Sequence, residues 1–331
     1  MKHTLGDTSQ QTLSVTGKIL TNSILFFVLL ALNLIQFLFL PLLTNNTYVI
    51  VLALGLIALT SNTLWSLVHE CIHGNFSPNT KVNLFAGRIL ALVFGAPFYV
   101  LQFAHLMHHR YNRYWDCEYY DPQKTNGFVK HLGYYSYIFG GVYLMSIITA
   151  VAITVFRKNI LLKALAARYR DRAQSDQILE LTKNYFLKKY RLIEIKAETL
   201  LIVSFATLSF YCYGKMWYIP LAIYLVRALF ISFFDNVYHY NTPVEKVRYA
   251  RELALPRSFS LFILYFNHHG THHETPSICW QDIGKLTRSP EHSYDGNMWS
   301  SLVAQLKGPL VKTDPQATHS AENAHPAIEF V

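Results

Sequence analysis

Long apolar stretches separated by short polar links dominate the pattern of this chain. The first two cover residues 19–43 and 48–68. Each is long enough for a helix that crosses the hydrocarbon core of a bilayer, which takes roughly 20 residues. Because the link between them, residues 44–47, is short and polar, we expect the two helices to form a membrane hairpin.

Four further apolar stretches cover residues 84–103, 132–156, 199–213 and 217–234. Arg88, Gly95 and Pro97 interrupt the first of these, and Gly140 and Gly141 lie near the middle of the second. We therefore expect 84–103 to lie in the interface or to re-enter the membrane, and 132–156 to form two half-length helices. The last two stretches, separated by residues 214–215, are expected to form a second hairpin.

Clusters of histidine follow several of these stretches. They read HECIH at 69–73, HLMHH at 105–109, DNVYH at 235–239 and HHGTHH at 268–273. Residues spaced i, i+3 and i+4 share one face of a helix, so each cluster can direct two or three side chains at one ion. Imidazole suits iron, zinc, copper and nickel. The candidate ligands are His69, His73, His105, His108, His109, His239, His269, His272, His273 and Asp235.

The repeated spacing is unexpected for a chance arrangement. With 15 histidines in 331 residues, H-x-x-H-H should occur roughly 0.03 times per chain, and it occurs twice. Nine histidine ligands are too many for one ion, so we expect a di-metal site. Asp235 has two open interpretations, as a ligand (directly or through water) or as a partner that orients His239. The role of His268 also stays open, and we interpret His3, His131, His292, His319 and His325 as ordinary core or surface residues.

The fold class follows from the number of membrane crossings. Clusters that form one site must share one side of the membrane, so an even number of crossings separates them. Residues 157–196 hold eleven Lys or Arg against four acids, which is typical of a cytoplasmic segment. We therefore expect an all-α, multi-pass integral membrane protein with four transmembrane helices in two hairpins, in-plane helices and a cytosolic helical cap that holds the di-metal site. Residues 1–310 would form this membrane domain, and 311–331 a disordered tail.

Composition agrees with a membrane protein. Apolar residues make up 52% and charged residues 15% of the chain, whereas soluble domains average about 25% charged residues. The net charge of +9 is compatible with nucleic acid or with an anionic membrane surface. The apolar stretches favour the membrane, and the sequence contains no nucleic-acid-binding module.

The histidine boxes carry a family resemblance. HECIH, HLMHH and HGTHH resemble, in type and order, the three boxes of the membrane fatty acid desaturase and hydroxylase superfamily, and DNVYH resembles its additional N-x-x-x-H group with Asp235 in place of Asn. The resemblance implies two iron ions and O2 as co-substrate. The chain has no H-P-G-G motif and no ferredoxin cysteine set, so we expect an external electron donor of the ferredoxin, rubredoxin or cytochrome b5 type.

The reaction that we expect is desaturation of a lipid acyl chain. Related di-iron enzymes hydroxylate or ketolate substrates such as carotenoids, or decarboxylate fatty acids to terminal alkenes, and the sequence leaves these outcomes open. A different class is also compatible with one box, because HECIH matches the H-E-x-x-H motif of zinc metalloproteases with Glu70 as general base. That interpretation needs only three protein ligands and leaves the other boxes unexplained.

Overall fold

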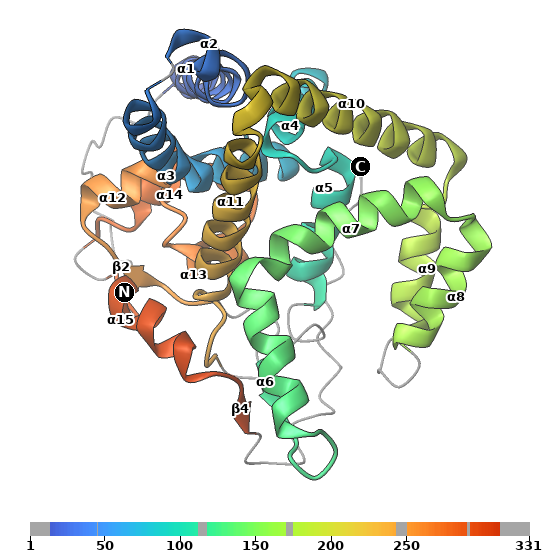
Figure 1. Cartoon of the computed structure of the whole chain (residues 1–331). Helices are drawn as coiled ribbons and strands as arrows, with labels where there is room; N and C mark the ends of the chain where they lie inside the picture. The colour runs from blue at the N-terminus through green and yellow to red at the C-terminus, as the bar shows by residue number, and fades with distance from the viewer. Residues whose placement is uncertain are drawn as a thin grey trace.

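The computed structural model describes residues 14–44, 46–111, 118–169, 175–242, 250–289 and 292–311. Of the tail expected at 311–331, only Val311 lies within the described residues. The described part is almost entirely helical (Figure 1). Its α-helices are α1 (Val15–Leu34), α2 (Leu40–Leu43), α3 (Thr47–Ile72), α4 (Thr80–Phe94), α5 (Phe98–Tyr111), α6 (Gly127–Ser136), α7 (Val142–Val155), α8 (Lys158–Tyr169), α9 (Ser175–Tyr185), α10 (Lys189–Tyr213), α11 (Tyr218–Asn236), α12 (Arg257–Phe262), α13 (His269–Glu274), α14 (Trp280–Leu286) and α15 (Met298–Ala304).

Four of the described helical stretches are long and apolar enough to cross a membrane: Val15–Leu43, Thr47–Ile72, Gly127–Val155 and Tyr218–Asn236. The first includes the π-helical segment η1 (Ile35–Phe39) between α1 and α2. Three of the four coincide with predicted spans. The fourth was expected at 199–213, but those residues form the end of α10, whose first half carries charged side chains such as Glu194 and Glu198. The pairing of the spans into hairpins stays a prediction.

Exposed apolar side chains cover the outer faces of these helices. Phe27, Leu52 and Val155 are 66%, 67% and 67% exposed on three of the candidate spans. Leu200 is also 67% exposed, so the second half of α10 presents apolar surface as well. Apolar side chains exposed along candidate spans are expected where a helix faces lipid.

The apolar stretch 84–103 is broken, as its Gly and Pro residues predict. The axes of α4 and α5 differ in direction by 101° across a short link. Gly95 supports the turn, because it ends α4 with a φ of 99° that L-residues rarely adopt. The Arg227 side chain of α11 is 2% exposed and holds this bend, since its guanidinium donates to the Val93 and Phe94 carbonyl oxygens at 2.7 and 3.0 Å. It also donates to Asn33 Oδ1 of α1 at 2.6 Å.

The break predicted at Gly140 is present too. Segment η3 (Tyr137–Gly141) joins α6 to α7, and Phe139 and Gly140 have non-helical backbone angles inside it. Gly140 has a φ of 127°, and a Cβ there would contact the Ala228 side chain of α11 at 3.6 Å. The stretch is therefore kinked where it packs against α11.

Short elements after α11 fold the C-terminal part of the described chain against the helices. Strand β1 (Tyr119–Tyr120) pairs in parallel with β4 (Leu310–Val311), and β2 (Leu253–Ala254) pairs in parallel with β3 (Gly296–Asn297). Two 3-10 turns, η4 (Gly214–Met216) and η5 (Gln305–Lys307), complete the elements. Helix α13 lies in the middle of this part, beneath α11 in Figure 1.

Candidate metal centre

The first histidine box lies at the C-terminal end of α3. His69 is in the last turn of the helix, and His73 is its C-cap. The helix stops because Gly74 has a φ of 78°, and the Asn75 N–H then bonds the Glu70 carbonyl oxygen at 2.8 Å. The box is therefore presented at the end of a candidate membrane span, as its sequence position predicts.

The other boxes come from three separate elements. His105, His108 and His109 lie on α5, where the i, i+3 and i+4 spacing places them on one side of the helix. His269, His272 and His273 lie on the short helix α13. Helix α11 ends at Asn236, so His239 lies in the turn that follows it and not on a continuous helix with Asp235.

All nine predicted histidines meet in two adjacent groups. The first group, called here the five-histidine group, contains His69, His73, His105, His109 and His272. The second, the four-histidine group, contains His108, His239, His269 and His273. Within each group, one ligand nitrogen from every residue lies within 4.8 Å of the others.

The nitrogen spacing in the five-histidine group fits a shared ion. The Nε2 atoms of His73 and His105 are 2.8 Å apart, those of His105 and His109 are 3.0 Å apart, and those of His109 and His272 are 3.0 Å apart. Two nitrogens bound at right angles to one ion at about 2.1 Å lie about 3.0 Å from each other. Hydrogen bonds alone do not explain these contacts. His105 Nε2 and His109 Nε2 each lie close to two other Nε2 atoms, but one Nε2 atom either donates one hydrogen bond or accepts one.

The nitrogen atoms of the four-histidine group have the same spacing. An unpaired buried nitrogen in the five-histidine group is a further indication of a metal site. His273 Nε2 is 3.2 Å from His108 Nε2 and 3.1 Å from His269 Nε2. In the five-histidine group, the buried His69 Nε2 has no hydrogen-bond partner among the described residues. A buried polar atom of this kind is costly unless it has a partner. Both groups therefore fit a metal ion held by imidazole nitrogens.

Burial keeps these imidazoles in the form that binds metal. It lowers the pKa of His73 to about 3. The pKa values of His269, His272 and His273 are also held well below the usual range, first by burial and then by repulsion from neighbouring histidines. The side chains are neutral at physiological pH, and neutral imidazole offers a lone pair to an ion.

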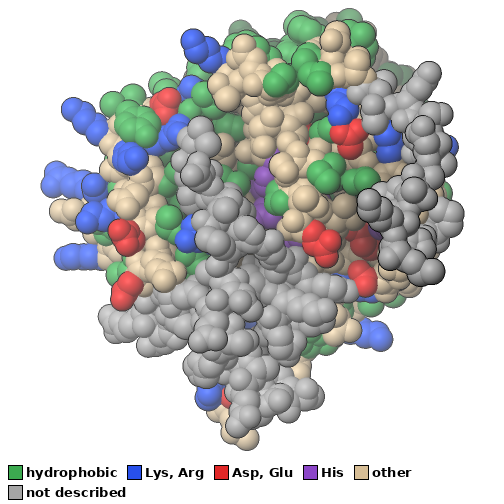
Figure 2. Space-filling view, turned by 180° about the vertical axis from the view of Figure 1, so that it is seen from behind, with side chains coloured by type: hydrophobic (Ala, Val, Ile, Leu, Met, Phe, Trp, Pro, Cys, Tyr) green, Lys and Arg blue, Asp and Glu red, His purple; other side chains and the backbone are tan. Residues whose placement is uncertain are grey.

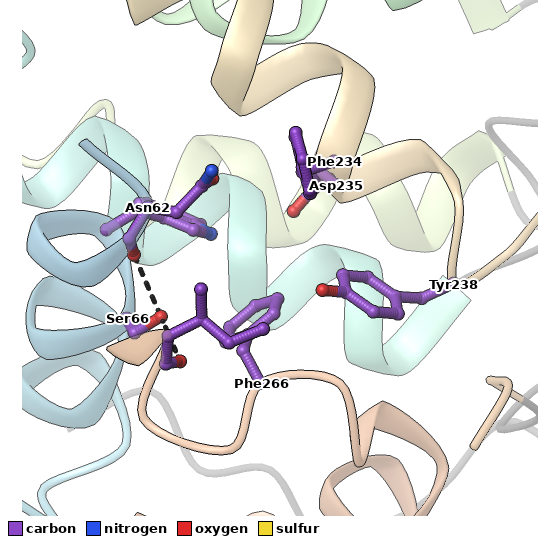
Figure 3. Close-up of a pocket in the computed structure, with 8 residues that line it drawn as sticks. Asn62, Ser66, Phe234, Asp235, Tyr238 and Phe266 are labelled. Carbon is purple, nitrogen blue, oxygen red and sulfur yellow. Dashed lines mark hydrogen bonds between the residues drawn. The ribbon is translucent and has the colours of Figure 1, made fainter. Parts of the chain in front are cut away.

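Asp235 lies outside both groups. Its side chain lines a small, mainly apolar pocket between α3 and α11, together with Asn62, Trp65, Ser66, Phe234, Tyr238, Ile263 and Phe266 (Figure 3). A ligand role for Asp235 stays a prediction, but its position makes it a pocket residue first. A second cavity shares Ser66 and Phe266 with this pocket and is lined by His69, His269 and His272.

Glu70 takes part in the structure around the site without joining either group. Its side chain is 3% exposed, and its carboxylate accepts a hydrogen bond from the Trp280 N–H at 3.2 Å. The Trp280 indole in turn donates to Asn22 Oδ1 of α1 at 2.9 Å. These contacts tie the segment after the third box to the membrane helices. In an H-E-x-x-H protease the Glu side chain acts as general base beside the metal. The Glu70 carboxylate is bonded to the Trp280 backbone instead.

Further hydrogen bonds attach the segment that precedes the third box to helix α3. Thr63 Oγ1 donates to the Phe262 carbonyl oxygen at 2.7 Å, and Ser66 Oγ donates to the Ile263 carbonyl oxygen at 2.9 Å. The backbone immediately after is strained, because Leu264 and Tyr265 have φ values of 53° and 56°. No periodic pattern predicts these supports, because each is a single polar residue that bonds a distant backbone atom.

Sequence reasoning also missed one group of polar residues beside the site. Glu252, His268 and His292 converge, although their positions in the chain show no ligand spacing.

Near the centre of the face shown in Figure 2, histidine side chains come into view, and Lys and Arg side chains gather toward the α8 and α9 side. Helix α8 carries Lys158, Lys163 and Arg168 of the charge predicted to be cytoplasmic.

Comparison with known proteins adds one decisive observation. The family model described as fatty acid desaturase matches residues 45–297. The chain belongs to the fatty acid desaturase family. Comparisons with curated proteins and with solved structures found no significant match. Family membership implies an oxidoreductase that acts on fatty acids, and the matched range includes every histidine of both groups. In this desaturase-family chain, the histidines of the predicted boxes lie in groups that could hold metal ions.

Proposed function

We propose that the chain is an O2-dependent di-iron oxidoreductase that introduces a double bond into a lipid acyl chain. The observation that carries this proposal is the meeting of nine histidines from three boxes and one turn in two adjacent groups of five and four. Two bound iron ions, reduced by an external donor protein of the ferredoxin, rubredoxin or cytochrome b5 type, would supply with O2 the oxidant that an unactivated C–H bond requires.

The pocket beside the groups supports an acyl substrate. Its walls contact histidines of both groups, since the Trp65 ring centroid is 6.1 Å from that of His105 and the Tyr238 ring centroid is 5.0 Å from that of His269. Phe266 bridges the two, with centroids 4.9 Å from His69 and 4.7 Å from His269. An apolar chain held against these rings would lie next to the metal ligands.

The residues of the pocket would also determine the outcome of the reaction. Aromatic walls exclude water and restrict motion of the chain, and a chain that is held rigidly loses a second hydrogen and forms an alkene. A looser chain would receive oxygen and become an alcohol. Asp235 places a carboxylate on the pocket wall, so we expect the apolar part of the substrate, and not an anionic head group, to occupy this position.

Deuterated fatty acids provide the test of the reaction. Cells that express the chain should convert a deuterated acyl chain into a product with a new internal double bond and two fewer deuterium atoms, measured by lipid mass spectrometry. His109→Ala should abolish this product, because it removes a ligand of the five-histidine group. His131→Ala is the matched control, since His131 belongs to neither group. Only hydroxylated or ketolated products, or only terminal alkenes of shortened chains, would contradict desaturation.

A second variant tests the pocket separately from the metal. Ile263→Trp should fill the pocket and reduce product formation at least tenfold while the metal content stays unchanged. Leu261→Trp is the control, because Leu261 is 49% exposed on α12. Equal product formation by the two variants would show that the substrate binds elsewhere.

A further inference from the structure

A third group of potential ligands lies apart from the nine histidines. Glu252 precedes β2, His268 precedes α13, and His292 lies shortly before β3. Local backbone pairing brings these three segments together. The Glu252 N–H donates to Asp295 Oδ2 at 2.7 Å, and the Asp295 N–H donates to the Glu252 carbonyl oxygen at 2.8 Å. The Leu253 N–H donates to the Asn267 carbonyl oxygen at 3.0 Å, which fixes His268 beside Glu252.

The side-chain atoms of this group converge on one point. Glu252 Oε2 is 2.9 Å from His268 Nδ1 and 3.2 Å from His292 Nε2. The side chains of His268, Glu252 and His292 are only 4%, 13% and 15% exposed. The other carboxylate oxygen, Glu252 Oε1, accepts the Thr271 N–H, so Oε2 alone faces the two imidazoles.

Hydrogen bonds do not satisfy every polar atom of this group. His292 Nε2 is buried and has no hydrogen-bond partner among the described residues, although it lies near Glu252 Oε2. The same combination of close ligand atoms and an orphaned imidazole nitrogen is present in the five-histidine group. Separations of 2.9 and 3.2 Å are also what two ligands at right angles around one ion produce, at about 3.0 Å.

We propose that Glu252, His268 and His292 form a third, mononuclear site for a divalent first-row transition metal ion. Two imidazoles and one carboxylate are an established ligand set for such ions and leave other coordination positions open. The Tyr294 ring covers the group, with its centroid 5.8 Å from that of His268 and 4.9 Å from that of His292.

The position of the site indicates a structural role. Glu252 holds the Thr271 N–H within α13, and His268 directly precedes the helix, so an ion here would fix the helix that supplies His269, His272 and His273. None of the three ligands lines the described pockets beside the nine histidines. The proposal therefore does not depend on which reaction the chain catalyses.

Metal counting tests the third site. The full chain, purified in detergent, would be stripped with a chelator and reloaded anaerobically with Co2+, and cobalt would be counted by mass spectrometry. We expect three ions per wild-type chain, two for His292→Ala and three for the control His131→Ala. His292→Gln keeps a polar side chain of similar size and should also bind two, which protects the test against a folding defect in the alanine variant.

Two results would overturn the proposal. The first is a wild-type chain that binds only two ions at saturating Co2+, or a His292→Ala chain that binds as many as the wild type. The second is loss of all cobalt from both His292 variants, because that would show that His292 supports the nine-histidine centre and does not bind an ion of its own.

Discussion

The histidine boxes on α5 and α13 each contribute side chains to both groups. His69 and His73 belong only to the five-histidine group, and His239 belongs only to the four-histidine group. The division arises on single helices. On α5, His105 and His109 face one group and His108 the other, and α13 divides its histidines in the same way. Substitution of individual histidines can therefore test each group separately.

This division predicts selective loss of metal. His73→Ala should lower the iron content of purified protein by about one ion per chain, and so should His239→Ala, since each removes a ligand from a different group. The double variant should lose about two ions per chain. The measurement is iron and zinc analysis after full loading, with His131→Ala as control. A reproducible single zinc ion that His272→Ala does not remove would exclude the di-iron centre.

The buried Arg227 gives a second prediction for a single residue. Arg227→Met keeps much of the apolar length of the side chain but leaves the Val93 carbonyl oxygen and the Asn33 amide oxygen without the Arg227 donor, whereas the Phe94 carbonyl oxygen keeps its bond from the Tyr143 hydroxyl. An unsatisfied buried acceptor costs about 1–3 kcal/mol, so we expect a clear fall in the thermal unfolding temperature in detergent. Arg257→Met, at an exposed position on α12, should change it little. Equal stability of the two variants would show that the bend does not depend on Arg227.

The nine histidines could be predicted from sequence because the helix repeat converts spacing into a shared face. Their division into groups could not, because it depends on how α5 and α13 rotate toward each other. The spacing does not decide the role of Asp235, which stays a prediction. Its spacing from His239 matches a helical turn, but α11 ends between them, and its side chain lies in the pocket. Glu252 and His292 carried no local signal, since bonds between distant segments, such as those of Asp295 with the Glu252 backbone, bring them together.

Among the elements, breaks in the apolar pattern were the most informative features of the sequence. Gly95 and Pro97 predicted the bend between α4 and α5, and Gly140 predicted the kink between α6 and α7. The role of α10 was harder to predict, because its charged first half and apolar second half form one helix of 25 residues. Glu198 on this helix is held by Arg88 of α4 at 2.6 Å, a contact between elements that no periodicity reveals.

Close packing of α14 against the third box gives a prediction for an element. A Cβ on Gly284 would lie 2.3 Å from the Tyr265 ring. That ring has little freedom to move, because the Tyr265 backbone has a positive φ and the ring stacks on Trp280. Gly284→Ala should destabilise the protein by about 1–3 kcal/mol, as overpacking of a core does. Gly133→Ala on α6 is the control, since nothing lies within 4 Å of its Cβ, and an equal effect of both changes would contradict close packing at Gly284.

An ion pair that ties α14 to α1 predicts a dependence on pH. Burial alone would raise the pKa of the Asp282 carboxyl, but hydrogen bonds from Lys18 and Cys279 lower it below its usual value. A lowered folded-state pKa stabilises the protein above the unfolded pKa of about 3.9, and the effect is lost as the pH falls through the folded value. The stability difference between the wild type and Asp282→Asn should therefore be constant above about pH 5 and shrink below about pH 4. A difference that stays constant down to pH 3, or that Asp176→Asn reproduces, would contradict this assignment.

At the scale of the whole molecule, one arrangement has to satisfy both the bilayer and the metal centre. The four candidate spans expose apolar side chains, while the histidines lie at or beyond helix ends and are joined by the segment after α11. The sequence predicted the membrane and the meeting of the boxes. It did not predict which apolar stretches cross completely, because length and hydropathy do not reveal a helix that bends against its neighbours.

The side of the membrane that holds the metal centre gives the last prediction. Residues 157–196 hold eleven Lys or Arg against four acids, and such segments stay in the cytoplasm. We therefore expect single cysteines at Glu180 on α9 and at Ser300 on α15 to react with a membrane-impermeant maleimide only after the cytoplasmic face is opened. A cysteine at Lys215, in the turn η4 between α10 and α11, should react from the opposite side, because α10 and α11 both cross in the predicted second hairpin. The kinked stretch Gly127–Val155 must then enter and leave the membrane on the cytoplasmic side. All three positions are exposed, and the wild-type chain controls for its own cysteines. Labelling of Glu180→Cys from outside intact cells would place α9 on the other face. Labelling of Ser300→Cys and Lys215→Cys from the same side would show that α11 does not cross.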